Sequence, residues 1–234
     1  MRLVHAVGMD IRFQMRQGFY YAYALVCLFY VIVFHFLPDA HLEKVSIAIV
    51  FSDPSALGFF FIGGIVLLER EQSTLDSLFV TPLRIHEYLI SKIMSLTILA
   101  LMSSTFTMLI FHHDQLNILT FSVAVVLTSI FFTLLGLILA VRVSSVNEYL
   151  YLSPLYIIVF FLPLLEYFNI YDTWLMNLLP TRATLLLLDG SLDIITVSQF
   201  IYACIIQAVW ILVVYVFAYK AFYKFIVLRI GGSK

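Results

Sequence analysis

Long apolar runs, separated by short polar segments, divide most of the chain. Each run is close to the roughly 20 residues that an α-helix needs to cross about 30 Å of hydrocarbon. The pattern therefore predicts an all-α membrane protein with six transmembrane helices. The predicted spans are residues 19–37, 45–68, 88–111, 118–141, 149–168 and 197–219.

Residues 1–17, before the first span, follow a different pattern. Apolar residues recur at spacings of three and four from Val4 to Met15, and three arginines lie among and beside them. This pattern is typical of an amphipathic helix that lies in the inner headgroup layer of a membrane. The alternative is an ordinary cytoplasmic tail.

Lysine and arginine are unevenly distributed over these spans. Of the 13 basic residues, only Lys44 and Arg182 fall on the side opposite the termini. Because cytoplasmic loops carry an excess of Lys and Arg, we expect both termini to lie in the cytoplasm.

The composition agrees with a membrane protein. Apolar residues make up 63% of the chain and charged residues 12%, and the mean hydropathy is +1.04. These values exclude a water-soluble surface, and the spans leave no room for a folded catalytic domain. The formal net charge of -1, without a basic surface, argues against nucleic-acid binding.

Asp53 lies inside the second apolar run, where a charged side chain is a candidate functional residue. One interpretation places it in the transport path. The other treats Asp53 as the cap of a helix that begins at Pro54, which would break the span near its outer end.

Ser129 and Thr133 in the fourth run belong to a stripe of small residues that continues at Gly136. Such a stripe lets another helix approach closely, so packing is one interpretation and a substrate-facing path is the other.

On the outer side, Glu166 follows Pro163, a residue that can break the fifth span. We interpret Glu166 as hydrated at the interface, with a place in the pathway as the alternative. Residues 169–196 contain short apolar stretches and predict short helices that dip into the outer interface, or else a surface loop.

The sequence shows no pattern typical of catalysis or metal binding. His112, His113 and Asp114 lie in a short loop, but adjacent histidines point apart on a helix and no second pair has ligand spacing. We therefore expect no metal site and no enzymatic activity in this chain.

The densest charge cluster lies in the cytoplasmic segment 69–84. Ser73, followed three residues later by Asp76, approximates a capping box and predicts a short helix over residues 73–80. One face of this helix is apolar and consists of Leu75, Leu78 and Phe79. That face either binds a partner protein or lies on the lipid interface.

This region resembles the membrane subunit of type-2 ATP-binding cassette (ABC) exporters, and most of all the fluoroquinolone-export permeases. The resemblance covers nearly the whole chain and rests on residues 58–64, 67–71, 74–75, 80–84, 87–89, 91–92, 146–150 and 178–181.

The resemblance implies that residues 73–80 form a coupling helix that docks on a separately encoded ATPase subunit. The residues that it assigns to coupling are Glu69, Glu71, Ser73, Thr74, Leu75, Asp76, Leu78, Phe79, Thr81, Pro82 and Arg84. ATP and Mg²⁺ would bind to that ATPase and no cofactor to this chain, in which Gly-x-x-x-x-Gly-Lys-[Ser/Thr] does not occur.

The cytoplasmic end of the fifth span carries a second capping-box pattern, formed by Ser145 and Glu148. Capping explains Glu148 in the ordinary way, and an energetic link to the ATPase is the alternative. Asn147, its neighbour, has no assigned role.

The working hypothesis is a permease subunit of an exporter that moves an amphipathic or hydrophobic molecule, such as a drug, lipid or peptide. It would lie in a bacterial or archaeal plasma membrane, paired with itself or with a related permease chain. The rival hypotheses are an ion-coupled secondary transporter, which needs paired charges near mid-membrane, and an intramembrane enzyme.

Overall fold

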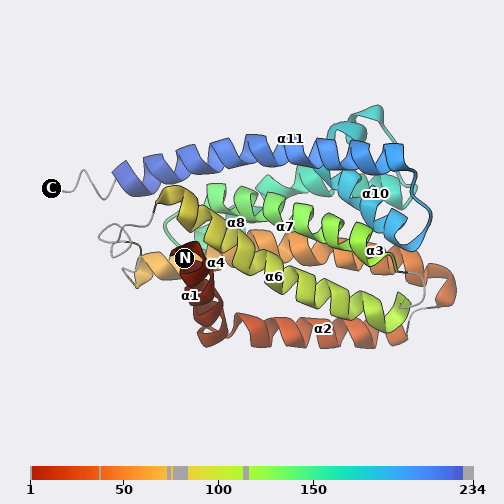
Figure 1. Ribbon diagram of the computed structural model, residues 1–234, viewed down its shortest axis with the longest axis horizontal. Helices are drawn as coiled ribbons and strands as arrows, with labels where there is room; N and C mark the ends of the chain where they lie inside the picture. The colour runs from red at the N-terminus through yellow and green to blue at the C-terminus, as the bar shows by residue number, and fades with distance from the viewer. Residues whose placement is uncertain (1, 37, 73–74, 76–83, 113–115, 229–234) are drawn as a thin grey trace.

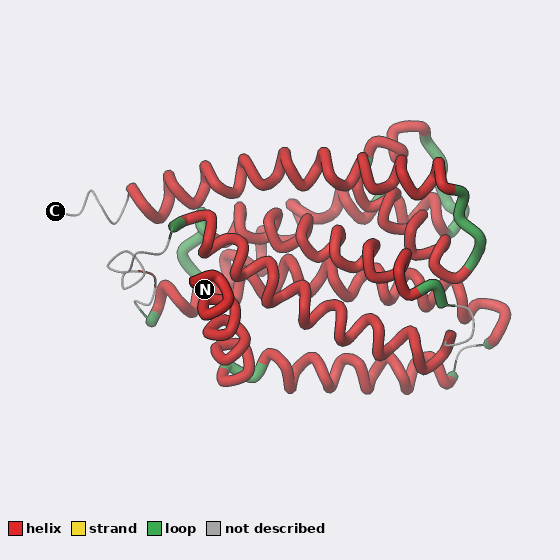
Figure 2. The backbone as a smooth tube through the Cα atoms, viewed as in Figure 1, coloured by secondary structure: helices red, strands yellow, loops and turns green. Residues whose placement is uncertain are grey.

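The computed structural model describes residues 2–36, 38–72, 75, 84–112 and 116–228. Within these ranges the chain is helical nearly throughout and contains no strand (Figure 2). The elements are α1 (Arg2–Arg16), α2 (Phe19–His35), α3 (Asp39–Ala56), η1 (Leu57–Phe61), α4 (Ile62–Glu71), α6 (Ile85–His112), α7 (Ile118–Ala140), α8 (Val146–Phe161), α9 (Pro163–Tyr167), η2 (Trp174–Leu178), α10 (Pro180–Leu192), α11 (Val197–Phe222) and η3 (Tyr223–Val227).

The long helices lie side by side in one bundle (Figure 1). The ends of α4 and α11 and the beginning of α6 lie near α1, at what we call the α1 end. The opposite end carries α10 and the junction between α2 and α3, and we call it the α10 end. The prediction of an all-α membrane protein is confirmed.

Four helical stretches are long and apolar enough to cross a membrane, and they are Leu42–Glu71, Ile85–Ile110, Ile118–Ala140 and Val197–Val227. The pair α1 and α2 gives a fifth if it counts as one bent span. Helices α2 and α8 have 17 and 16 residues, which is shorter than the roughly 20 that a span requires. The structure thus provides four or five candidate spans, and the count of six stays a prediction.

Helix α1 meets α2 at an angle of 67°. The turn is made at Gly18, whose φ of +84° lies in the left-handed region that glycine adopts without steric cost. The face of α1 that packs on the bundle consists of Val7, Asp10 and Gln14, whereas Val4 is exposed. Two of the three buried side chains, Asp10 and Gln14, are polar, so this helix packs on the bundle mainly through polar residues that the predicted amphipathic pattern does not include.

The predicted break at Asp53 is wrong. Helix α3 continues through Asp53 and Pro54, and the irregularity comes at η1, which is a π-helix. A proline within a membrane helix is tolerated when its neighbours pack around it, and Pro54 is buried. Asp53 therefore caps no helix.

Close packing between η1 and α7 explains the small residues of both elements. A Cβ atom at Gly136 would lie 2.5 Å from the carbonyl oxygen of Phe59, and one at Gly58 would lie 2.9 Å from the amide nitrogen of Thr133. The hydroxyl of Tyr149 in α8 donates to the same Phe59 oxygen at 2.6 Å. Three helices therefore meet at one backbone position.

At the α10 end, Pro163 separates α8 from α9, as the sequence analysis anticipates. The segment after α9 does contain short helices, η2 and α10. Most of α10 is buried, however, and the Thr128 hydroxyl of α7 donates to Thr184 in α10 at 2.9 Å. Helix α10 is therefore part of the core, in contrast to the interfacial helix that we expected.

Replacing Gly136 with alanine should destabilise the fold by about 1–3 kcal/mol, because the added methyl group has to displace backbone atoms of η1. Thermal unfolding of the detergent-solubilised protein measures this change. Gly8→Ala is the matched control, since a Cβ atom there meets nothing within 4 Å and alanine favours a helix by up to about 1 kcal/mol. Equal effects of the two substitutions would contradict the packing described for Gly136.

Candidate functional site

A buried ion network lies at the α1 end, and we call its four residues, Asp10, Glu69, Tyr88 and Lys92, the ionic joint. The Lys92 ammonium donates to Asp10 Oδ1 at 2.5 Å and to a Glu69 carboxylate oxygen. Lys92 is only 2% exposed, Glu69 5% and Asp10 9%.

The joint connects three helices. Asp10 belongs to α1, Glu69 to α4 and Lys92 to α6. The Tyr88 hydroxyl, one helical turn before Lys92, donates to Glu69 Oε2 at 2.8 Å. A buried ammonium that is shared by two carboxylates requires both of them in place, so a displacement of one helix affects the other two.

Hydrogen bonds next to the joint connect the same helices further and add the chain that follows α7. Gln14 Nε2 donates to Ser95 Oγ at 2.8 Å, one turn further along both α1 and α6. Arg70 Nη1 donates to the backbone oxygen of Val143 at 2.6 Å, and Nη2 to that of Val141 at 3.2 Å. Arg70 thus ties the end of α4 to the chain that leaves the C-terminal end of α7.

The structure changes the interpretation of the predicted coupling residues. Glu69 is an internal partner of Lys92, whereas Glu71 and Arg84 are exposed. Leu75 is 2% exposed and belongs to the hydrophobic core, so its predicted role on a partner-facing surface is wrong. The other predicted coupling residues lie outside the described residues, and they are Ser73, Thr74, Asp76, Leu78, Phe79, Thr81 and Pro82.

The polar residues that the sequence analysis offered for a transport path do not form one site. Ser129 and Thr133 are fully buried in the contact of α7 with its neighbours, where the Thr97 hydroxyl donates to Ser129 Oγ at 3.2 Å. Their position favours packing. Asp53 is 1% exposed, and neither of its carboxylate oxygens has a hydrogen-bond partner among the residues described.

Glu148 lies in the first turn of α8 and takes part in the capping of its N-terminus. Its backbone N–H donates to the side chain of Ser145, which caps α8, and its carboxylate accepts from the backbone N–H of Ser144 at 2.8 Å. This backbone hydrogen bond, with one from the Ser144 hydroxyl, lowers the pKa of Glu148. Capping is thus confirmed, although the Glu148 carboxylate binds Ser144 and not Ser145. Asn147 is exposed.

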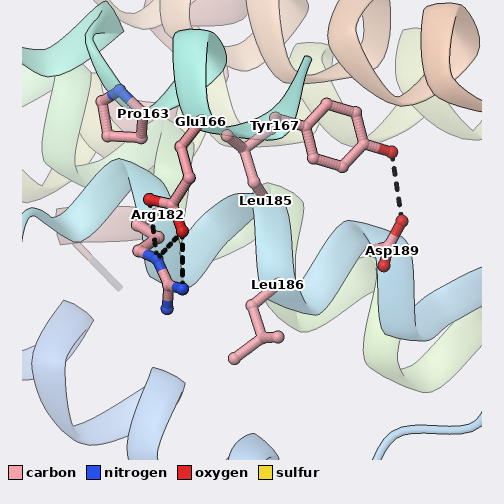
Figure 3. Close-up of a pocket in the computed structure, with 7 residues that line it drawn as sticks. All are labelled: Pro163, Glu166, Tyr167, Arg182, Leu185, Leu186 and Asp189. Carbon is pink, nitrogen blue, oxygen red and sulfur yellow. Dashed lines mark hydrogen bonds and ion pairs between the residues drawn. The ribbon is translucent and has the colours of Figure 1, made fainter. Parts of the chain in front are cut away.

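A pocket of about 240 Å³ opens at the α10 end between α9 and α10 (Figure 3). The Arg182 Nη2 atom pairs with Glu166 Oε1 at 2.7 Å, and the Tyr167 hydroxyl donates to Asp189 at 3.1 Å. Hydrogen bonds to Glu166 raise the pKa of Arg182, so its guanidinium stays charged. Glu166 is therefore part of an ion pair and not simply hydrated. The pocket is smaller than the roughly 300 Å³ at which drug-sized sites begin, so it fits only a part of such a molecule.

Sequence reasoning missed Asp10 and Lys92 as site residues. The signal that could have found Lys92 is its position in the third apolar run, since a charge inside a span nearly always has a partner. Asp10 could not be assigned as that partner, because 82 positions separate the two residues along the chain.

Comparisons with known proteins agree with a transport protein. Residues 1–230 match the model of the fluoroquinolones export permease protein family. Two fluoroquinolones export permease proteins of Mycobacterium tuberculosis, from strains CDC 1551 and H37Rv, are each 26% identical to the chain over 198 residues. That alignment covers 84% of this chain and 84% of each relative.

Lys92→Met should destabilise the protein strongly, because it leaves two carboxylates buried without a counter-charge. We expect a loss of about 3–5 kcal/mol, measured as a fall of about 5–10 °C or more in melting temperature in detergent. Adding Glu69→Gln should restore part of the loss, since it removes one of the uncompensated charges. Lys44→Met, at an exposed position, is the matched control and should have little effect. Similar melting temperatures for the two single variants would show that the joint does not stabilise the fold.

Proposed function

The chain belongs to the fluoroquinolones export permease protein family, and on this premise we propose that it is the membrane-spanning permease subunit of an ABC exporter. A separately encoded ATPase subunit would bind ATP and Mg²⁺ and supply the energy. The exported molecule would be amphipathic or hydrophobic, as the apolar and aromatic composition suggests.

The observation that carries this proposal is the ionic joint. Glu69 lies near the end of α4, four residues before the segment 73–80 that resembles a coupling helix, and it shares Lys92 with Asp10. A displacement of that segment would be transmitted to α1 and α6 through the ion pairs of Lys92. Through Arg70 it would also reach the chain that follows α7.

The mechanism requires the ATPase to bind the permease differently in its two nucleotide states. A partner that bound both conformations equally would shift no equilibrium, however tight the binding. We propose that closure of the ATPase dimer moves the end of α4, and that the joint passes this movement to α1 and α6. The spans would then open alternately to the two sides of the membrane.

The proposal further includes six spans, both termini in the cytoplasm of a bacterial or archaeal cell, and a second permease chain. It is supported by the excess of lysine and arginine on one side of the predicted spans. It also agrees with the common location of the ends of α4 and α11 at the α1 end of the bundle (Figure 1).

Because Leu75 is buried in the chain's own core, we choose Leu78 to test coupling. This residue lies outside the described residues and is selected from the sequence pattern. Leu78→Asp should reduce substrate-stimulated ATP hydrolysis by about tenfold or more in the co-purified complex, because it places a charge in the docking face. The chain should still insert in the membrane.

Leu175→Asp makes the same chemical change at an exposed position in η2, which packs against α10, and should leave ATP hydrolysis unaltered. Identification of the ATPase that co-purifies with the native chain completes the test. Unchanged hydrolysis in the Leu78→Asp complex would refute the coupling role. Transport by the chain alone, driven by an ion gradient, would replace the proposal with a secondary transporter.

A further inference from the structure

Asp53 is a buried carboxyl group without a hydrogen-bond partner among the described residues. It lies in α3 within the candidate span Leu42–Glu71 and is 1% exposed. Neither oxygen has a hydrogen-bond partner in the part of the chain that the structure describes. An ionised carboxylate in such surroundings is strongly disfavoured unless a cation or a proton joins it.

Hydroxyl groups from two other helices, α2 and α6, lie around this carboxyl. The Tyr23 hydroxyl of α2 and the Ser104 hydroxyl of α6 are both buried, and neither has a hydrogen-bond partner among the described residues. Both hydroxyls, together with that of Tyr30, lie beside the carboxyl group, but no hydrogen bond to Asp53 is formed within the described residues. We call Asp53, Tyr23, Tyr30 and Ser104 the Asp53 centre.

The chemistry of the centre suits an organic cation better than a metal ion. No group of three or more His, Cys, Asp or Glu side chains with metal-binding geometry exists among the described residues. The centre instead combines one negative charge with aromatic rings. The rings of the centre are those of Tyr23 and Tyr30, and the Tyr23 ring is held edge-on against Phe61 at 6.2 Å. Carboxylates and aromatic faces together recognise ammonium and similar organic cations.

We propose that the Asp53 centre binds the positively charged group of an amphipathic organic cation, which makes such cations a substrate class of the exporter. This inference rests on the proposed export function. In the absence of the cation, a proton would neutralise Asp53.

The centre is closed in this structure, so a ligand can enter only if α2 moves away from α3 and α6. Helix α2 is suited to such a movement because it lies at the edge of the bundle with one face largely exposed. Tyr21, Leu25 and Leu28 on this face are 61–76% exposed. The helix is joined to α1 by the turn at Gly18, where nothing lies within 4 Å of the Cβ position.

The test compares two probes of nearly equal size and opposite charge, tetraphenylphosphonium and tetraphenylborate. Binding to the purified chain in lipid nanodiscs is measured by equilibrium dialysis, without an ATPase. Asp53→Asn should weaken tetraphenylphosphonium binding by about tenfold or more, because it removes the counter-charge and keeps the shape. Tetraphenylborate binding should not weaken.

Asp172→Asn is the matched control, since it makes the same change at an exposed position outside the centre and should leave phosphonium binding unaltered. Tyr23→Phe removes one hydroxyl and keeps the ring, and we expect it to weaken phosphonium binding by about threefold. This variant decides the question if the D53N chain does not accumulate in the membrane.

Equal phosphonium affinity of the native chain and D53N would overturn the inference and leave Asp53 as a site for a proton only. Unchanged binding by Tyr23→Phe would overturn it if D53N cannot be obtained. The binding measurement is separate from the coupling test, because it requires no ATP hydrolysis. A failed coupling test with successful phosphonium binding would therefore reject the ABC mechanism and keep the cation site.

Discussion

The cost of burying a charge governs the arrangement of the α1 end. The Lys92 ammonium is almost completely shielded from solvent, and it is stable there only because Asp10 and Glu69 both reach it. This requirement holds α1 against α6 and fixes the end of α4 beside them. Asp10 and Gln14 also explain why α1 lies across the bundle with polar side chains turned inward. The helix is tied to the bundle, and its apolar residues Val4 and Met15 remain available to the lipid.

Close backbone packing governs the middle of the bundle. Glycines at positions 58 and 136 let η1 and α7 approach until backbone atoms nearly touch, and Tyr149 bonds the carbonyl oxygen of Phe59 that lies between them. Apolar side chains gain little free energy from leaving lipid, so close approach and hydrogen bonds provide much of the attraction between membrane helices. The ionic joint and this packed centre therefore make a stiff unit, whereas α2 has few buried side chains and one largely exposed face.

The sequence predicted the helical class, because apolar runs are a local signal, and the family, because its motif residues are contiguous along the chain. The Ser145 cap and the break at Pro163 were found in this way. For the small-residue stripe through Ser129 the sequence left packing and a substrate path open, and the burial of Ser129 and Thr133 favours packing. Local signals misled at Asp53 and Pro54, which resemble a helix start, because the buried neighbours of α3 keep the helix continuous through both residues. The same kind of local signal gave a wrong prediction for Leu75. Its helical spacing predicted a position on an apolar face that contacts a partner or lipid, whereas the side chain is buried in the core.

By itself, therefore, the sequence determined that this protein is a helical membrane protein of an export permease family, since both conclusions depend on composition, spacing and motif. Only the tertiary structure decided which charges are paired. It joined Lys92 to residues 82 and 23 positions away, and it left Asp53 without a partner among the residues described. The physical reason is that the energy of a charge in a membrane depends on what lies within a few ångströms of it, and those neighbours come from helices that are distant along the chain.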